Sequence, residues 1–143
     1  MDRQAGRVTP FVIDTNALLS FITDRNLDQQ VVVKKHIQKA LSSQQDIVVL
    51  SHVISEFVYV LEKVYGLKLN KIHSILAQIA DAPGFAIEDY VDLDELLVIW
   101  PNKVKNYGDA VLACFAISKK LPVLTFDQKF SRELVNCRVG LIK

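Results

Sequence analysis

The stretch Phe11-Val12-Ile13-Asp14-Thr15-Asn16 decides how the rest of this chain is interpreted. Three consecutive apolar residues followed by an acid are typical of a short strand that is buried on both faces, as in a parallel sheet. Such a strand delivers its last side chain to the carboxyl edge of the sheet, where open α/β folds bind their ligands. Asp14 is therefore predicted to stand at a ligand-binding edge, with Thr15 or Asn16 starting the next helix. Alternatively, Asp14 is only a turn or cap residue.

The length and composition are those of one globular domain. The 143 residues are 50% hydrophobic and 23% charged, which is ordinary for such domains, and a core of useful size is expected. No apolar run approaches the roughly 20 residues that cross a bilayer. The polar N-terminus lacks the apolar segment of a signal peptide. We expect a single domain over residues 1–143, with a loose lead-in over residues 1–9, located in the cytoplasm and not in a membrane.

Apolar patterns along the chain alternate between strands and helices. Strands are predicted at residues 11–14, 47–50, 85–87, 122–126 and 139–142. Helices are predicted between them, including one from Ser51 to Tyr65, one capped by Asn70, and the very apolar helix opened by residues 106–109. Strands that alternate with helices imply a parallel sheet covered on both faces. The sequence therefore predicts the α/β class.

Charge is unevenly distributed, although the formal net charge is only +1. Residues 81–95 carry six acids and no base, whereas residues 101–143 carry eight bases and three acids. A basic end is compatible with a polyanionic partner, and it is also typical of an ordinary solvated surface. Asp92 and Glu95 have the spacing of a capping box, so the acidic segment is not interpreted as a metal site.

Four acids occupy comparable places in the predicted elements. Asp14 and Asp127 directly follow buried strands, and Glu56 and Asp109 lie near the starts of two apolar helices. In a parallel sheet, the carboxyl ends of strands and the N-termini of the following helices share one edge. The four carboxylates are therefore expected to converge. Glu56 by itself could instead simply complement the helix dipole.

Converging carboxylates favour a divalent cation. Such acids repel one another and raise each other's pKa unless a cation compensates them. Mg²⁺ prefers oxygen ligands and is usually held by a few carboxylates together with a substrate phosphate, where it activates water and stabilises charge on a phosphodiester. The sequence has no Walker-type phosphate loop, no Ser-His-Asp arrangement and no metal-ligand spacing of Cys or His. The other candidate ligands are interpreted as structural: His36, His52, His73, Cys114 and Cys137.

Four short motifs together resemble a known family. Val12-Ile13-Asp14-Thr15-Asn16, Ser55-Glu56-Phe57, Gly108-Asp109-Ala110 and Leu124-Thr125-Phe126-Asp127 are similar, in order and spacing, to the motifs of the PIN domain. The resemblance runs from about Phe11 to Ile142. In length and layout the chain is most similar to the VapC-type toxin ribonucleases of toxin–antitoxin pairs. The resemblance implies a three-layer α/β fold with a central, mostly parallel sheet flanked by helices.

The resemblance also implies a site, position by position. Four residues match the family's metal-binding and catalytic acids: Asp14, Glu56, Asp109 and Asp127. Three match small polar residues that support the carboxylates through hydrogen bonds: Thr15, Asn16 and Thr125. Many relatives carry a further Asp two residues after the fourth acid, where this chain has Lys129. A second metal is then expected to bind weakly or only with substrate, or Lys129 contacts a phosphate instead.

The implied activity is Mg²⁺- or Mn²⁺-dependent endonucleolytic cleavage of RNA. Single-stranded loops are the expected targets, because their bases can be splayed into a site. The implied partners are the RNA substrate, an antitoxin whose short peptide occupies an apolar groove, and a second copy of the chain. Two helical stripes could form the dimer surface or fill the monomer core: Val58, Leu61 and Tyr65, or Ile72, Ile75 and Ile79.

Other functions remain open on the sequence. A free-standing PIN nuclease that processes RNA would use the same four acids. A phosphatase with an aspartyl nucleophile also begins with an acid after its first strand, but its chemistry needs a second Asp where this chain has Asn16. A non-catalytic RNA-binding or interaction module with the same fold would keep four acids that have only an electrostatic cost.

Overall fold

The computed structural model describes residues 9–142, so the lead-in predicted over residues 1–9 lies outside it apart from residue 9. Within the described residues, four strands form one sheet in the order β3-β2-β1-β4, and every pairing is parallel. The strands are β1 (Phe11–Ile13), β2 (Ile47–Leu50), β3 (Phe85–Glu88) and β4 (Val123–Leu124). The predicted parallel sheet is confirmed.

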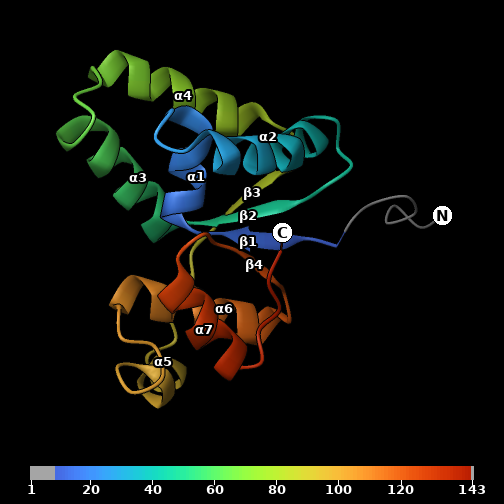
Figure 1. Cartoon of the computed structure of the whole chain (residues 1–143), viewed down its shortest axis with the longest axis vertical. Helices are drawn as coiled ribbons and strands as arrows, with labels where there is room; N and C mark the ends of the chain where they lie inside the picture. Colours follow the sequence, from blue (N-terminus) through green and yellow to red (C-terminus); the bar gives the residue numbers. More distant parts are fainter. Residues whose placement is uncertain (1–8, 143) are drawn as a thin grey trace.

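Helices cover both faces of this sheet and complete three layers (Figure 1). One face carries α1 (Thr15–Ile22), α2 (Leu27–Leu41), α3 (Ser51–Lys63) and α4 (Leu69–Asp81). The other carries α5 (Leu93–Ile99), α6 (Tyr107–Lys119) and α7 (Gln128–Asn136). The three-layer α/β fold expected from the resemblance is therefore confirmed. None of the described helices combines the length and the apolar character needed to span a membrane.

The most completely buried elements are two strands, β1 and β2, and one helix, α6. Every residue of β1 and β2 is buried, as expected for parallel strands covered on both faces. On the second face, α6 is buried over seven consecutive residues from Ala110 to Ala116. A helix that is apolar all round belongs inside a core. The start of α6 is consequently held in place, and so is the backbone of Asp109, which lies in its first turn.

The register of the sheet brings distant segments to one edge. Ile13 pairs with Leu124, so the residues that follow them, Asp14 and Thr125, emerge together at the carboxyl ends of β1 and β4. α3 begins at the same edge, because Ser51 follows β2 without an intervening loop. This common edge is where open α/β sheets bind ligands.

The prediction that Thr15 or Asn16 starts the first helix is confirmed, because α1 begins at Thr15. Asp14 is itself the N-cap of α1: its backbone is extended, and its Oδ1 accepts a hydrogen bond from the Ala17 amide at 2.8 Å. Asp14 is therefore the single residue between the end of β1 and the start of α1. The alternative interpretation of Asp14 as a cap is therefore correct for one of its two carboxylate oxygens.

Two local predictions are wrong. Asn70 is not a cap but lies inside α4, whose N-cap is Lys68. The Lys68 carbonyl already accepts the first helical hydrogen bond, so the helix begins before Asn70. The strand predicted at residues 139–142 reduces to one bridge between Leu141 and Val123, because β4 is only two residues long and offers little to pair with.

The two helical stripes mostly fill the monomer. Leu61, Ile72 and Ile75 are buried within the chain, so these residues cannot serve a dimer surface without rearrangement. Tyr65 is 40% exposed and stays accessible to a partner. Cys114 is buried and Cys137 half-buried, and both are free thiols, in agreement with their interpretation as structural residues.

Candidate active site

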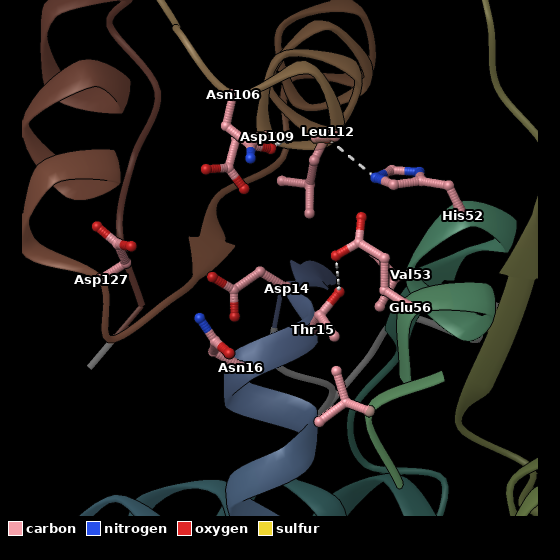
Figure 2. Close-up of a pocket in the computed structure, with 12 residues that line it drawn as sticks. Asp14, Thr15, Asn16, His52, Val53, Glu56, Asn106, Asp109, Leu112 and Asp127 are labelled. Carbon is pink, nitrogen blue, oxygen red and sulfur yellow. Dashed lines mark hydrogen bonds between the residues drawn. The ribbon is translucent and has the colours of Figure 1, made fainter. Parts of the chain in front are cut away.

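One cavity of about 200 Å³ opens at the carboxyl edge of the sheet (Figure 2). Its walls come from α1, α3, α6 and the segment between β4 and α7. Four acids predicted from the sequence all line it: Asp14, Glu56, Asp109 and Asp127. The expected convergence of these residues on one place is therefore found in the structure.

Asp14 is the most deeply placed of the four acids, at 5% exposure. Its Oδ1 is bound by the Ala17 amide at 2.8 Å, and its Oδ2 accepts a hydrogen bond from the Thr125 hydroxyl. Burial raises the pKa of Asp14 to about 6, although the Thr125 and Ala17 hydrogen bonds counteract the increase. Asp14 is thus a carboxylate of fixed orientation whose negative charge is poorly solvated.

Asp109 sits in the first turn of α6. The cap of that helix is Asn106, whose side-chain oxygen accepts a hydrogen bond from the Asp109 amide at 2.9 Å. The pKa of Asp109 is raised to about 7, chiefly by burial and also by the nearby charges of Asp14, Asp127 and Glu56. A helix N-terminus favours a negative charge, so an increase at this position means that burial, together with the neighbouring carboxylates, outweighs the helix dipole.

Glu56 enters the cavity from α3, and a glycine lets it do so. Its Oε2 accepts a hydrogen bond from the Thr15 hydroxyl at 3.1 Å. A Cβ placed on Gly108 would lie only 2.7 Å from Glu56 Oε1. One turn earlier in α3, His52 Nε2 lies 2.9 Å from the Gly108 carbonyl oxygen. Gly108 therefore permits the close approach of α3 to the start of α6 that brings Glu56 to the site.

Asp127 forms the rim of the cavity and caps the last helix. Its Oδ1 accepts a hydrogen bond from the Phe130 amide at 2.9 Å, and its own amide donates to Thr125 Oγ1 at 3.1 Å. Lys129 is exposed in the first turn of α7 and does not line the cavity. Its contact with a phosphate stays a prediction.

The three supporting residues behave differently. Thr125 is hydrogen-bonded to Asp14, and Thr15 to Glu56, so each orients an acid. Asn16 lines the cavity, but within the described residues its side chain makes no hydrogen bond to an acid. Its backbone carbonyl accepts from Ser20 and Arg25 instead. The predicted supporting role has a structural basis for the two threonines only.

The donor set suits a hard divalent cation, although the acids are not preassembled around one. Among residues 9–142, no three Asp, Glu, His or Cys side chains lie close enough together to hold a metal ion without moving. Carboxylate oxygens are nevertheless the ligands that Mg²⁺ and Mn²⁺ prefer. The raised pKa values of Asp14 and Asp109 record repulsion and burial that a bound cation would relieve. The residues therefore fit the ion, provided that side chains rotate toward it.

Six wall residues were not predicted as part of the site, and three of them are apolar: Val53, Val60 and Leu112. The other three are His52, Asn106 and Gly108. His52 precedes Glu56 by four residues and thus lies on the same face of a helix, which is a signal that the sequence contains. The closeness of Gly108 to Glu56 depends on the packing of α3 against α6, and no local pattern reveals it.

Solved structures with the same fold come from several organisms. PAE2754 from Pyrobaculum aerophilum is 19% identical and superposes with a TM-score of 0.62 over 90% of this chain and 82% of its own. Mycobacterium tuberculosis VapC20, a Sarcin-Ricin loop cleaving toxin, is 16% identical, with a TM-score of 0.62 over 85% of this chain and 93% of its own. VapBC-1 from nontypeable Haemophilus influenzae is 14% identical, with a TM-score of 0.58 over 94% and 98%. These similarities concern the fold.

The sequence itself carries the family signal. No curated protein matches the chain by sequence. The family model described as the PIN domain matches residues 11–133, a segment that includes all four acids of the cavity from Asp14 to Asp127. This match covers most of the chain and agrees with the observed three-layer fold. The chain belongs to the PIN domain family.

Proposed function

We propose that this chain is an endoribonuclease that depends on a divalent metal and hydrolyses RNA phosphodiester bonds at the four-acid cavity. The convergence of carboxylates from four separate segments carries the proposal. Gathering like charges at one partly buried place is costly without a cation to compensate them. A non-catalytic module would bear this cost without benefit, and family membership leaves the phosphatase alternative without support.

Mg²⁺ or Mn²⁺ is the proposed cofactor, and four residues would hold it: Asp14, Glu56, Asp109 and Asp127. When bound, the metal supplies an activated water and stabilises the charge on the reacting phosphate. Asp14 offers a carboxylate that is fixed from two sides by Thr125 and Ala17. Asp109 lacks a hydrogen bond to its carboxylate among the described residues, so it can turn toward an ion. The chain thus combines one ligand of fixed orientation, Asp14, with one whose carboxylate can turn, Asp109.

Thr125→Val is expected to reduce cleavage by about 10- to 100-fold, the usual cost of losing a residue that orients a metal ligand. Valine keeps the shape but not the hydroxyl that binds Asp14 Oδ2. Since this hydrogen bond lowers the pKa of Asp14, its loss should also move the acid limb of the pH–rate profile to higher pH. The measurement is kcat/KM against pH.

Thr23→Val is the matched control for this variant. Thr23 is also a buried threonine, and its hydroxyl donates to the Leu19 carbonyl at 2.9 Å, outside the cavity. We expect a comparable effect on stability and no shift of the pH–rate profile. An unchanged profile in Thr125→Val as well would mean that Thr125 does not tune Asp14.

Gly108→Ala is expected to impair cleavage by about 10-fold or more without destabilising the fold. The added methyl would lie 2.7 Å from Glu56 Oε1 and push this flexible side chain out of place, while alanine suits a helix better than glycine does. Gly140→Ala is the control, because its methyl makes an ordinary contact of 3.5 Å with Pro122. Equal activity and equal thermal stability in both variants would show that the lack of a side chain at Gly108 is not needed to position Glu56.

We also propose that the chain is the toxin of a type II toxin–antitoxin pair and associates with a second copy of itself. Two of the similar structures are a VapC toxin and a VapBC protein, which supports this role. An apolar groove of about 80 Å³ between α1, α2 and α4 offers a place for an antitoxin segment. Its apolar walls include Leu18, Phe21, Ile22, Ile37, Leu41, Ile75 and Ile79.

Purified protein incubated with total cellular RNA tests the proposed function. Cleavage at discrete positions in Mg²⁺ or Mn²⁺, abolished by EDTA, is the expected result, and mapping the new ends identifies the substrate. No cleavage in either metal, from folded protein that is free of inhibitor, would favour the binding module. A short neighbouring reading frame whose product blocks cleavage supports the toxin, and its absence favours a free-standing RNA-processing nuclease.

A further inference from the structure

A second cavity, of about 310 Å³, adjoins the four-acid cavity. We term it the Arg25 pocket, and its lining residues are Asn16, Arg25, Asn26, Gln29, Phe126 and Asp127. It shares Asn16 and Asp127 with the four-acid cavity. Both residues lie on the side of Asp14 opposite to Glu56 and His52 (Figure 2). A chain that crosses the acids in this direction would enter the Arg25 pocket next.

Arg25 supplies positive charge where the acids supply none. It is the only Lys or Arg among the described residues that line either cavity. Its Nη2 donates to the Asn16 carbonyl at 2.5 Å and to Ser20 Oγ at 3.3 Å, which fixes the guanidinium beside α1. The other N–H groups have no partner among residues 9–142 and can donate to a phosphate. A polyanion that the carboxylates repel can therefore be bound here.

The remaining walls combine an aromatic ring with amide groups. Phe126 is half-buried, packs against the core and lines the pocket. Asn26 caps α2, and its side-chain oxygen accepts a hydrogen bond from the Gln29 amide at 3.0 Å. Gln29 Oε1 accepts one from the Ser20 hydroxyl at 3.1 Å. With these oxygens engaged, both side chains offer N–H donors to a ligand.

We propose that the Arg25 pocket binds the nucleotide next to the scissile bond, with its base against Phe126 and its phosphate on Arg25. The inference rests on the proposed ribonuclease function and adds a subsite for one unpaired nucleotide. Bases are available for stacking on an aromatic ring only when they are released from a duplex. The amide donors of Asn26 and Gln29 suit a base edge that carries acceptors, such as O4 of uracil or O6 of guanine.

The test measures binding in EDTA, so that it does not depend on cleavage. Two labelled probes are compared by fluorescence anisotropy: a short oligouridylate and a ribose-phosphate chain of the same length without bases. Phe126→Leu is expected to weaken oligouridylate binding by about 5- to 100-fold, the range for loss of a base–aromatic stack, and to leave binding of the baseless chain unchanged. Arg25→Ala should weaken both and reduce the slope of log affinity against log salt by about 0.7.

Lys35→Ala is the matched charge control, since Lys35 is exposed on α2 and lines neither cavity. It should preserve the ratio of affinities for the two probes. If Phe126→Leu does not fold, Gln29→Ala replaces it and should reduce the same ratio. Equal binding of the two probes by the parent, the same loss for both in Phe126→Leu, or no RNA binding at all would overturn the pocket assignment.

Cleavage of total RNA in Mg²⁺ separates this inference from the proposed function. A parent protein that cleaves RNA but does not distinguish the two probes is a nuclease without a base subsite at Arg25. A parent that prefers oligouridylate in a Phe126-dependent way, yet cleaves nothing, keeps the base subsite and loses the nuclease assignment.

Discussion

Asp14→Asn is expected to slow metal-dependent RNA cleavage by about 100-fold or more while leaving the protein folded. Losing a group that only orients a metal ligand typically costs 10- to 100-fold, and Asp14 is proposed as a ligand itself. Asparagine has the same shape and can still accept the Ala17 hydrogen bond that caps α1, but it removes the negative charge. Single-turnover cleavage of a mapped RNA substrate in Mg²⁺ measures the effect.

Asp24→Asn is the matched control for the loss of one negative charge. Asp24 is exposed and lines neither the four-acid cavity nor the Arg25 pocket, so its variant should cleave RNA at the parental rate. Thermal unfolding of all three proteins establishes that they are folded. If Asp14→Asn retained activity within a few-fold of Asp24→Asn, the carboxylate of Asp14 would not be part of the catalytic site.

The metal-free protein is expected to become less stable as pH rises. The pKa values of Asp14 and Asp109 are raised from 3.8 to about 6 and about 7 by burial. Between pH 3.8 and about pH 7 these two carboxyl groups bind more protons in the folded protein than in the unfolded chain. The unfolding free energy therefore falls with increasing pH. From about pH 5 to about pH 8 we expect a loss of about 2 kcal/mol, which allows for solvent screening of Asp109. The melting temperature should fall by roughly 5–10 °C.

Asp109→Asn should reduce this loss of stability at higher pH. Its neutral amide removes one titrating group from the cluster, so the metal-free variant should melt above the parent at about pH 8 and resemble it at about pH 5. Mg²⁺ should stabilise the parent at the higher pH, because a ligand that binds only the folded state raises stability. Mg²⁺ should stabilise the Asp109→Asn variant only slightly. Differential scanning calorimetry with EDTA or Mg²⁺ measures both effects.

The same unfolding curves for Asp24→Asn give the baseline for a surface charge change. This variant should follow the parent at both pH values and with both additives. A parent that is equally stable at both pH values, or that Mg²⁺ fails to stabilise, would contradict the assignment of Asp14 and Asp109 as crowded carboxylates that await a cation.

The elements that could be predicted are those whose residues carry their own signal. β1 and β2 are continuous apolar runs, since strands buried on both faces have no polar alternation, and α6 is apolar over its whole middle. The strand expected at residues 139–142 depends on a partner, and β4 is too short to pair with more than one of its residues. Whether this segment forms a strand is decided by tertiary contacts and not by its own residues.

In the site, too, some positions follow from local sequence signals and others depend on tertiary contacts. Asp14 and Asp127 could be placed at the edge because each follows an apolar strand segment, and Asp109 because Asn106 marks the start of its helix. Glu56 was also expected at this edge because its helix follows a buried strand, but its close contact with Gly108, in a helix remote in sequence, was not. A pairwise contact of this kind produces no periodicity or spacing that the sequence displays.

The Arg25 pocket could not be predicted at all. Arg25 follows α1 and Phe126 follows β4, and the two come together only because β1 and β4 are neighbours in the sheet. In the sequence, Arg25 is one residue of a polar helix break, and Phe126 is an apolar residue between two polar ones. Neither has a local feature that indicates a ligand.

Calorimetric titration of Mn²⁺ into the metal-free protein near pH 6.5 tests whether the four acids bind a cation. Because Asp14 and Asp109 are partly protonated at this pH, binding should release protons, which two buffers of different ionisation enthalpy reveal. Asp14→Asn and Asp109→Asn should each bind Mn²⁺ at least about 10-fold more weakly, and Asp24→Asn should bind as the parent does. Binding of equal strength in all four proteins, or none in the parent, would contradict a cation site built from these acids.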